Sequence, residues 1–292
     1  MNKIYLFIFL AGSALLSQAQ NDSMAQKAHK WEHKLQTGVN LNQSSFSDNW
    51  KGGGVSSFAY AWFLNYLAKH HSDKWDVNSD LQMQLGFLQN QGEHQHKSSD
   101  RIFYDFKLGR KLSGKWDLFA SVNFLTQFKE GFDYKVKSLV EPTRDSLISN
   151  FLAPGYLTSS FGLEYKPVAY MWARFGVGTL RQTFVYDKRI SDAQLYGLKK
   201  PGDQLRNQGV LQFIVNFDKE IVKNVNFRWR YMVNYDYQNQ AMVHMINANL
   251  NLRATKYLST NVTVNMIKDP DQDKDIQLSQ SLALGILYNL SR

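Results

Sequence analysis

Histidines and carboxylates gather at one place in the sequence where they could hold a metal ion. Glu93, His94, His96 and Asp100 lie within one polar stretch, and a His-x-His pair beside carboxylates offers ligand types that zinc accepts. An exposed loop lacks the outer hydrogen bonds that orient metal ligands, so a solvated polar loop is the favoured interpretation. The glycines are scattered and form no phosphate-binding fingerprint. We therefore expect neither a metal nor a cofactor.

A serine activated by a histidine would be another source of catalysis. Apart from His33 at the start of the first one, the strands expected below contain a single histidine, His244, which shares a face with Ile246 and Leu250 that is predicted to meet lipid. The sequence names no serine within its reach, and no catalytic residue is predicted. We expect that the protein is not an enzyme, and a hydrolase of the outer membrane is the less favoured alternative.

Three arginines are the strongest candidates for binding chemistry. Arg228 and Arg230 stand two residues apart, so a strand would present both on one face, and Arg174 is expected at a similar depth. A planar guanidinium binds carboxylate or phosphate well, so these side chains could line a path or a binding patch for an anion. Ion pairs with acidic residues could instead fill the same space. The other interior candidates are Asp105, Lys107, Glu164 and Asp236.

The stretch from Asn224 to Gln238 shows what kind of element carries two of these arginines. Its odd positions from Val225 to Tyr237 are apolar or aromatic, and its even positions are polar except for Met232. Successive side chains of a strand point to opposite faces, so one face is continuously apolar. At about 3.3 Å per residue the alternation runs for roughly 45 Å, which is enough to cross a membrane at a tilt.

The same alternation recurs along the chain and predicts twelve strands. It is least regular in the seventh of them, where polar and apolar residues do not alternate cleanly. The predicted strands are His33–Asn42, Val55–Ala68, Lys74–Leu88, Arg101–Leu112, Trp116–Phe128, Tyr156–Lys166, Tyr170–Tyr186, Gly209–Asp218, Asn224–Gln238, Val243–Ala254, Tyr257–Ile267 and Ile276–Leu290.

The connections between these strands alternate in length. Five are short, such as Ser113–Lys115, and six are generally longer, such as Gln89–Asp100, Lys129–Ser149 and Asp187–Gln208. Barrels of the bacterial outer membrane have tight periplasmic turns, longer outer loops and an even number of strands. The sequence therefore predicts an all-β fold, a single antiparallel transmembrane β-barrel with both ends of the chain in the periplasm, rather than a soluble sandwich.

The first residues fit an export signal. Lys3 supplies a positive start, Ile4–Leu16 an apolar core, and Ser17–Ala19 a small-x-small cleavage site. We expect a signal peptide at 1–19, a periplasmic segment at 20–32 and the barrel at 33–292. No segment approaches the roughly 18 unbroken apolar residues of a transmembrane helix. The chain also has no cysteine, so disulfides and a lipid-acceptor thiol are excluded.

The charge of the chain bears on its partners. Lysine and arginine number 34 against 25 acidic residues, and removal of the signal would take only one lysine away. The basic residues are interleaved with acidic ones and form no stripe, so nucleic acid is not expected as a partner. Outer-membrane lipid, lipopolysaccharide and a small anionic solute suit a basic exported protein better. The oligomeric state is left open.

Four segments together resemble a known family, namely Asn49–Gly54, Asp100–Phe106, Trp116–Tyr134 and Ser149–Leu157. They resemble a family of exported Bacteroidota proteins that is named only as a domain of unknown function. The resemblance covers most of the expected mature chain and implies a barrel in the outer membrane of a Bacteroidota bacterium. It implies no substrate and no catalytic residue. The chain ends at Arg292 rather than at the aromatic residue common in such barrels.

Two functions of different classes follow from these features. The interior arginines and carboxylates favour a narrow channel or a solute-binding barrel. The long outer loops fit a structural or partner-binding component whose lumen is filled by ion pairs. Barrels of eight strands are filled by side chains and barrels of sixteen hold a channel, so twelve strands are compatible with either function.

Overall fold

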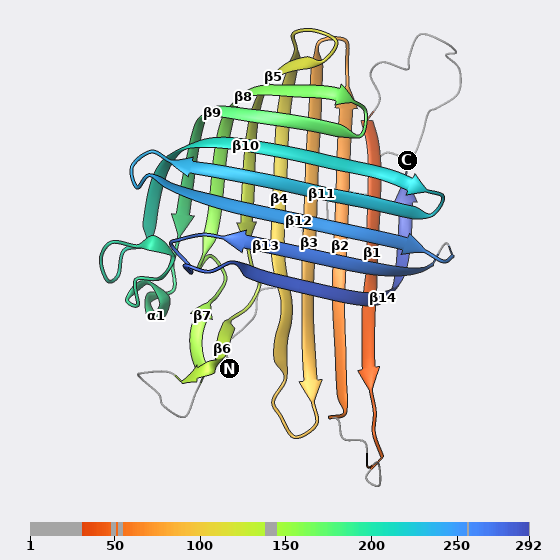
Figure 1. The fold of residues 1–292 in the computed structure, drawn as a ribbon, viewed down its shortest axis with the longest axis vertical. Coiled ribbons are helices and arrows are strands. Elements are labelled where there is room, and N and C mark those ends of the chain that lie inside the picture. The colour runs from red at the N-terminus through yellow and green to blue at the C-terminus, as the bar shows by residue number, and fades with distance from the viewer. Residues whose placement is uncertain (1–30, 48–50, 52–54, 138–144, 256, 292) are drawn as a thin grey trace, which may run out of the picture.

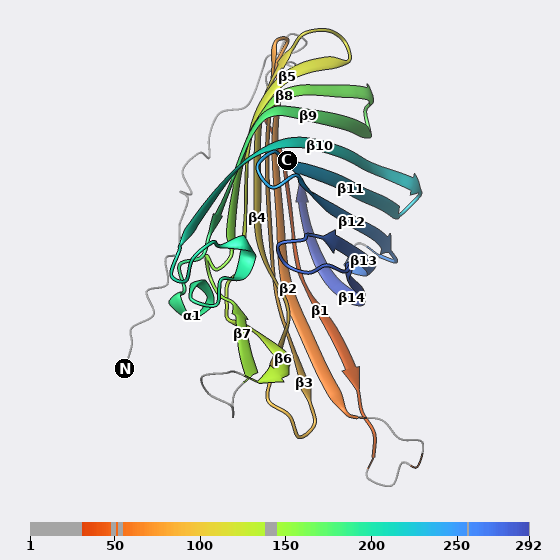
Figure 2. The same cartoon turned by 60° about the vertical axis from the view of Figure 1, so that its left-hand side comes forward.

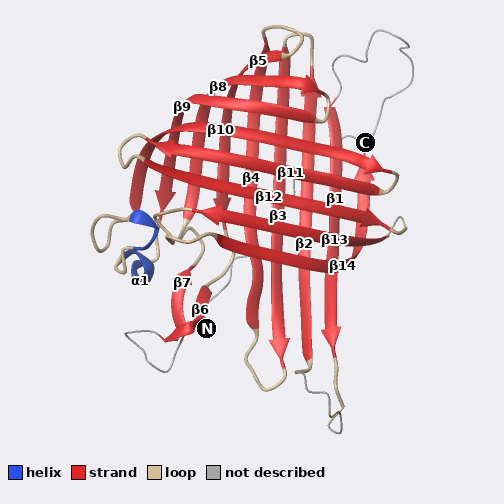
Figure 3. Ribbon diagram, viewed as in Figure 1, coloured by secondary structure: helices blue, strands red, loops and turns tan. Residues whose placement is uncertain are grey.

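A closed antiparallel barrel of twelve strands dominates the structure (Figures 1 and 3). The computed structural model describes residues 31–47, 51, 55–137, 145–255 and 257–291. The barrel strands, in their order around the wall, are β1 (Trp31–Ser44), β2 (Ser57–His71), β3 (Trp75–Asn90), β4 (His96–Lys111), β5 (Trp116–Thr126), β8 (Gly155–Val168), β9 (Met171–Phe184), β10 (Leu205–Val222), β11 (Val225–Asp236), β12 (Ala241–Arg253), β13 (Leu258–Lys268) and β14 (Gln277–Ser291).

The predicted fold class and strand count are therefore confirmed, and most strands are longer than predicted. β14 closes the barrel by pairing with β1, so that Lys34 lies opposite Ser291. Trp31 already belongs to β1, which shortens the expected segment 20–32. The expected signal peptide at 1–19 lies outside the described residues.

The two walls of the barrel run in different directions. β1 to β4 extend along the long axis of Figure 1, and β10 to β14 cross in front of them. Figure 2 shows the same walls from the side, with β8 to β10 bending from one direction to the other. The strands of the two walls therefore cross each other on opposite sides of the lumen.

The connections sort to the two ends as predicted, with three corrections. The five short turns and the ends of β1 and β14 lie at one end, which we call the turn end, and the six loops form the loop end. The predicted loop Gln89–Asp100 is wrong, because β3 and β4 continue through most of it and leave only residues 91–95. The loop after β5 contains the hairpin β6 (Gly131–Lys137) and β7 (Asp145–Ser149). The loop after β9 contains α1 (Lys188–Ser191) and the 3-10 helix η1 (Leu195–Gly197).

Apolar side chains lie on the outside of the barrel and polar ones on the inside. Outward residues such as Leu282 and Ile286 are 66% and 62% exposed, whereas the inward Asp105 and Glu164 are 1% and 0% exposed. A barrel in water would show the opposite distribution, because apolar surface is favoured away from water. An apolar band outside a polar interior is the arrangement of barrels that stand in lipid. No helix in the described residues is long and apolar enough to span a membrane.

The irregular alternation in the seventh predicted strand has a structural cause. The β8–β9 register shifts between Phe161 and Gly162, and the β9–β10 register shifts between Val210 and Gln212. Both shifts fall beside Val177 in β9, which is 64% exposed. A bulge inserts one extra residue and reverses the parity of the following side chains, so the interior residues change from even to odd positions along β9.

Two glycines beside this bulge give a matched prediction. A methyl group at Gly162 would collide with the backbone carbonyl of Phe175, whereas Gly178 has open space on its side-chain face. Gly162→Ala should therefore lower the free energy of unfolding by about 1 to 3 kcal/mol, as overpacking does, and Gly178→Ala should change it by less than about 0.5 kcal/mol. Urea unfolding in detergent micelles measures both. An equal loss in the two variants would contradict the described register.

Candidate functional site

A cluster of ion pairs fills one side of the lumen. At its centre Glu164 of β8 accepts from the Lys107 ammonium of β4 at 2.5 Å and from Arg174 Nε of β9 at 2.5 Å. Lys166 lies 3.3 Å from the same carboxylate. Glu164, Lys107 and Arg174 are all at most 5% exposed in their side chains. These charges are therefore removed from water and depend on each other for compensation.

The same cluster extends to the strands β3 and β5. Arg174 lies 3.7 Å from Asp105, which also accepts a hydrogen bond from Asn123. Lys166 reaches Asp76 of β3 at 2.6 Å and Asp117 of β5 at 2.5 Å. We call this set the wall network, and its members are Asp76, Asp105, Lys107, Asp117, Glu164, Lys166 and Arg174. Three cations meet four carboxylates, and Lys111 lies 3.7 Å from Asp76, so the network is close to neutral.

Side chains from nearly opposite walls meet at a second place, which we call the waist. The Arg230 guanidinium of β11 lies over the Phe103 ring of β4 at 5.8 Å and over the Trp172 ring of β9 at 5.6 Å. β4 and β11 are separated by four strands along one side of the wall and by six along the other. Arg101 also lies over Phe103, at 4.7 Å, and Arg174 lies over Trp172 at 4.0 Å. These contacts across the lumen make the waist a constriction.

Arg228 and Arg230 contact neighbours in the adjacent strand β10 rather than the other interior candidates. Arg228 pairs with Asp218 of the neighbouring β10 at 2.9 Å, and its side chain is 46% exposed near the turn end. Arg230 donates from Nε to Asn216 at 3.3 Å. Among the described residues, neither arginine forms an ion pair with Asp105, Glu164 or Asp236, because cross-strand neighbours in the β10–β11 register decide the direct contacts. Asp105 and Glu164 instead hold Arg174, the third predicted arginine.

Asp236, the last interior candidate, lies at the loop end and far along β11 from Arg228. It is 3% exposed and accepts hydrogen bonds from Gln208 at 2.6 Å and from Asn239 at 2.7 Å. Arg206 lies 3.8 Å from it and also pairs with Asp271 of the β13–β14 loop at 2.6 Å. Asp236 thus anchors loops and takes no part in the waist.

Asparagines line the wall opposite the wall network. Asn249 donates to Thr263 at 2.9 Å, Asn251 donates to Asn261 at 2.5 Å, and Asn247 donates to Asn265. All of these inward amides on β12 and β13 remain partly exposed, in contrast to the buried wall network. We call this surface the amide strip. It is uncharged, hydrogen-bonding and accessible to water.

The loops at the loop end form a small folded cap with its own apolar core. Ala153, Val185, Ile190 and Leu198 are buried against one another. Asp187 accepts hydrogen bonds from Arg189 and from Asn150, and these bonds lower the pKa of its carboxyl to about 2 although partial burial opposes them. Arg189 also pairs with Glu130 at 2.6 Å, so two loops are joined. The cap is therefore a defined surface rather than a set of independent loops.

The histidine-rich stretch does not converge on one point. Glu93 and His94 lie in the short β3–β4 connection, and His96 and Asp100 lie in β4. Asp100 accepts from the backbone N–H groups of Phe128 and Lys129 at 2.7 and 2.9 Å, which gives it a structural role. Within the described residues, no group of three or more metal-ligating side chains could hold a metal ion.

His244 is on the outer face, as predicted, but it is not the only histidine in a strand. His33 lies in β1, where the predicted strand began, and His70, His71 and His96 lie in strands because β2 and β4 extend beyond their predicted ends. His244 Nδ1 lies 2.9 Å from the Tyr231 hydroxyl, and the two rings stack. A tyrosine rather than a serine is thus its hydrogen-bond partner.

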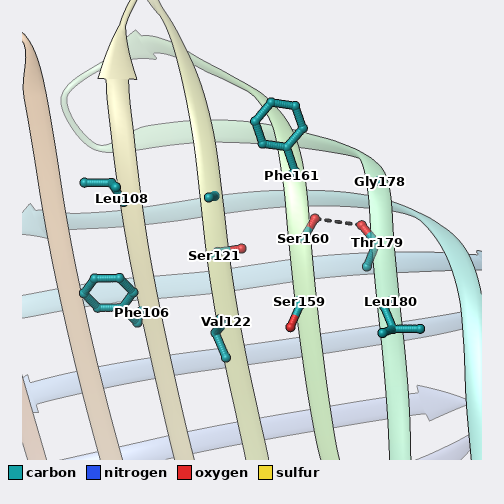
Figure 4. A pocket seen from close by; sticks show the side chains of 11 residues that line it. Phe106, Leu108, Ser121, Val122, Ser159, Ser160, Phe161, Gly178, Thr179 and Leu180 are labelled. Carbon is teal, nitrogen blue, oxygen red and sulfur yellow. Dashed lines mark hydrogen bonds between the residues drawn. The ribbon is translucent and has the colours of Figure 1, made fainter.

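A cavity of about 640 Å³ opens on the outer face, not on the lumen (Figure 4). It lies over β4, β5, β8 and β9, where the small residues Ala120, Ser159 and Gly178 leave a hollow between larger apolar side chains. The hydroxyls of Ser160 and Thr179, 2.7 Å apart, form part of its floor.

Several residues of the lumen were not predicted from the sequence as candidates. Lys166 and Asp117 complete the wall network, and Arg101, Phe103 and Trp172 form the waist together with Arg230. Arg101 and Phe103 stand four and two residues before Asp105, so the parity of the strand was a usable signal for both. Phe103 was hidden because an apolar residue on the polar face contradicts the pattern.

Part of the chain is similar in sequence to a known protein family. The family described as "Protein of unknown function (DUF3078)" matches residues 41–132. Over this stretch the chain is similar to that family. The match includes the first two segments of the resemblance and most of the third, whereas Ser149–Leu157 lies beyond it. No curated protein matches the chain.

Solved outer-membrane barrels resemble the chain at low identity. An outer membrane channel from Pseudomonas putida F1 has 8% identity and a TM-score of 0.40, over 94% of this chain and 100% of that one. The NanC porin has 8% identity and a TM-score of 0.41, over 86% and 98%. The CymD monoaromatic hydrocarbon channel has 12% identity and a TM-score of 0.34, over 91% and 90%. None of these similarities carries a site residue or a solute over to this chain.

Proposed function

We propose that the chain is an integral barrel of the outer membrane with a narrow polar lumen that binds or passes small solutes. The apolar outer face and polar interior support the membrane location. The turn end, where β1 begins and β14 ends, would face the periplasm, and the cap would face outward among lipopolysaccharide. The origin from a Bacteroidota bacterium stays a prediction.

One observation carries this function, namely the unequal burial of the two halves of the lumen. The wall network is packed and its charges are matched, whereas the amide strip and the arginine at its edge, Arg228, stay open to water. Partly exposed inward amides imply water-accessible space along that wall. A strip of amides offers both donors and acceptors, so it can replace the hydration shell of a small polar solute.

A second candidate is a structural or partner-binding barrel with a closed lumen. Its support is the waist, where Arg230 reaches Phe103 from a nearly opposite strand. The cap would then be the working surface. A hydrolase has the weakest support, since His244 faces outward and bonds to Tyr231. We therefore propose no enzymatic activity.

Conductance separates the first two candidates. The purified wild type in a planar lipid bilayer should give small, discrete conductance steps, and Phe103→Ala should enlarge them because it removes the ring at the waist. Phe161→Ala is the matched control, since Phe161 is 50% exposed on the outer face. It should leave the steps unchanged. Silence of both the wild type and Phe103→Ala would favour the closed, partner-binding barrel.

A further inference from the structure

Two arginines at the waist keep most of their hydrogen-bonding capacity unused. Among the described residues, neither Arg101 nor Arg230 has a carboxylate oxygen at ion-pair distance. Both place the flat guanidinium against Phe103, at 4.7 and 5.8 Å. Each group has about five N–H donors, and Arg230 uses Nε for Asn216. The donors at the edges of the guanidinium planes therefore remain available.

The nearby carboxylates do not neutralise this pair. Asp105 is engaged by Arg174 and Asn123 in the wall network. Asp80, opposite Asp105 in the β3–β4 register, accepts a hydrogen bond from Gln82 at 2.9 Å. Both arginines lie in the field of Asp80, and Arg230 also lies in that of Asp105, but among the described residues Asp80 is the one of these two carboxylates that no other cation pairs with. The remaining charge is positive, in a confined space where it acts more strongly than in bulk water.

The amide strip begins directly beside these arginines. Arg230 lies opposite Asn247 in the β11–β12 register, and Asn247 lies opposite Asn265 in the β12–β13 register. Planar guanidiniums bind carboxylates through two parallel N–H bonds, and amides bind hydroxyls as both donors and acceptors. The combination fits a molecule that carries one carboxylate next to several hydroxyl groups.

We propose that the waist is a binding site for a small hydroxylated monocarboxylate. Arg101 and Arg230 hold the carboxylate, and Asn247 and its neighbours on the amide strip hold the hydroxyls. The proposal rests on the proposed solute-binding lumen and names its class of ligand. It moves the anion site from the predicted pair Arg228 and Arg230, because Arg228 is committed to Asp218.

Three six-carbon probes separate the parts of this site by saturation-transfer NMR on the detergent-solubilised protein at fixed ionic strength. Gluconate has the carboxylate and the hydroxyls, hexanoate has only the carboxylate, and sorbitol has only the hydroxyls. Gluconate should bind most tightly, and Arg101→Gln with Arg230→Gln should weaken it about ten-fold or more, as loss of charged hydrogen bonds does. Arg110→Gln, the same charge change at an outward position of β4, should leave binding unchanged.

Asn247→Ala provides an independent variant should the double variant fail to fold. It should weaken gluconate and leave hexanoate unaffected. Equal binding of gluconate and either other probe, or unchanged binding in the arginine and Asn247 variants, would overturn the site. The measurement needs no conduction. Conductance without gluconate binding would support the proposed solute path but reject this class of ligand. Gluconate binding without conductance would support the binding site but reject passage through the lumen.

Discussion

Replacing Glu164 with glutamine should lower the free energy of unfolding by about 3 to 5 kcal/mol, the usual cost of breaking a buried ion pair from one side. The carboxylate lies at the centre of the wall network, with Lys107 and Arg174 both at 2.5 Å and its side chain 1% exposed. Its loss leaves two buried cations with too few partners. Urea unfolding in detergent micelles measures this loss, with the heat-dependent shift in gel mobility as the signal that distinguishes the folded barrel from the unfolded chain.

Two further variants show whether this cost comes from charge. Adding Lys107→Met to Glu164→Gln removes one of the stranded cations and should restore part of the lost stability. Glu220→Gln removes an exposed carboxylate that lies 3.6 Å from Arg253, and it should cost less than about 1 kcal/mol. A Glu164→Gln cost no larger than that of Glu220→Gln would contradict the buried network.

Leu282→Arg should cost about 2 to 4 kcal/mol in a lipid bilayer, because it places a cation on the lipid-facing side of a strand near its middle. Leu282 belongs to β14 and is 66% exposed on the outer face. Its neighbour Ser281 faces the lumen, where its side chain is exposed to water. An arginine introduced at this position would therefore lie in water. Ser281→Arg should therefore cost less than about 1 kcal/mol.

Unfolding in lipid vesicles compares these two adjacent sites directly. Because the two residues are adjacent in β14, the comparison tests which of them faces the lipid and which faces the lumen. Equal costs at Leu282 and Ser281 would mean that the assignment of inner and outer faces is wrong. A larger cost at Ser281 would mean that the lumen is too tightly packed to admit a solute.

The fold followed from alternation because the two faces of each strand meet different surroundings. A stretch such as Val225–Asp236 has one apolar face and one face that is polar except at Met232, and this period of two indicates both the strand and the face that each residue occupies. The bulge at Val177 hid part of β9, since one inserted residue reverses the parity. The hairpin β6–β7 and the short helix α1 escaped because loop segments carry too little periodicity to show regular structure.

The interior residues could be placed on the correct face, but their partners could not. Glu164 and Arg174 lie directly opposite each other in the β8–β9 register, and Asp218 lies opposite Arg228 in the β10–β11 register. A shift of one residue in either register would change these pairs, and register depends on bulges and turn geometry. The waist was invisible for another reason. Arg230 and Phe103 meet across the lumen, and their contact depends on how steeply the two walls cross.

Single cysteines test the central claim, a water-accessible polar lumen inside a barrel that faces lipid. The chain has no native cysteine, so each introduced thiol is unique. In lipid vesicles, a membrane-impermeant maleimide should label Asn249→Cys on the amide strip, whereas Ile246→Cys on the outer face should react only with a lipid-soluble maleimide. Labelling of Ile246→Cys by the impermeant reagent, or failure of that reagent to label Asn249→Cys, would contradict the account.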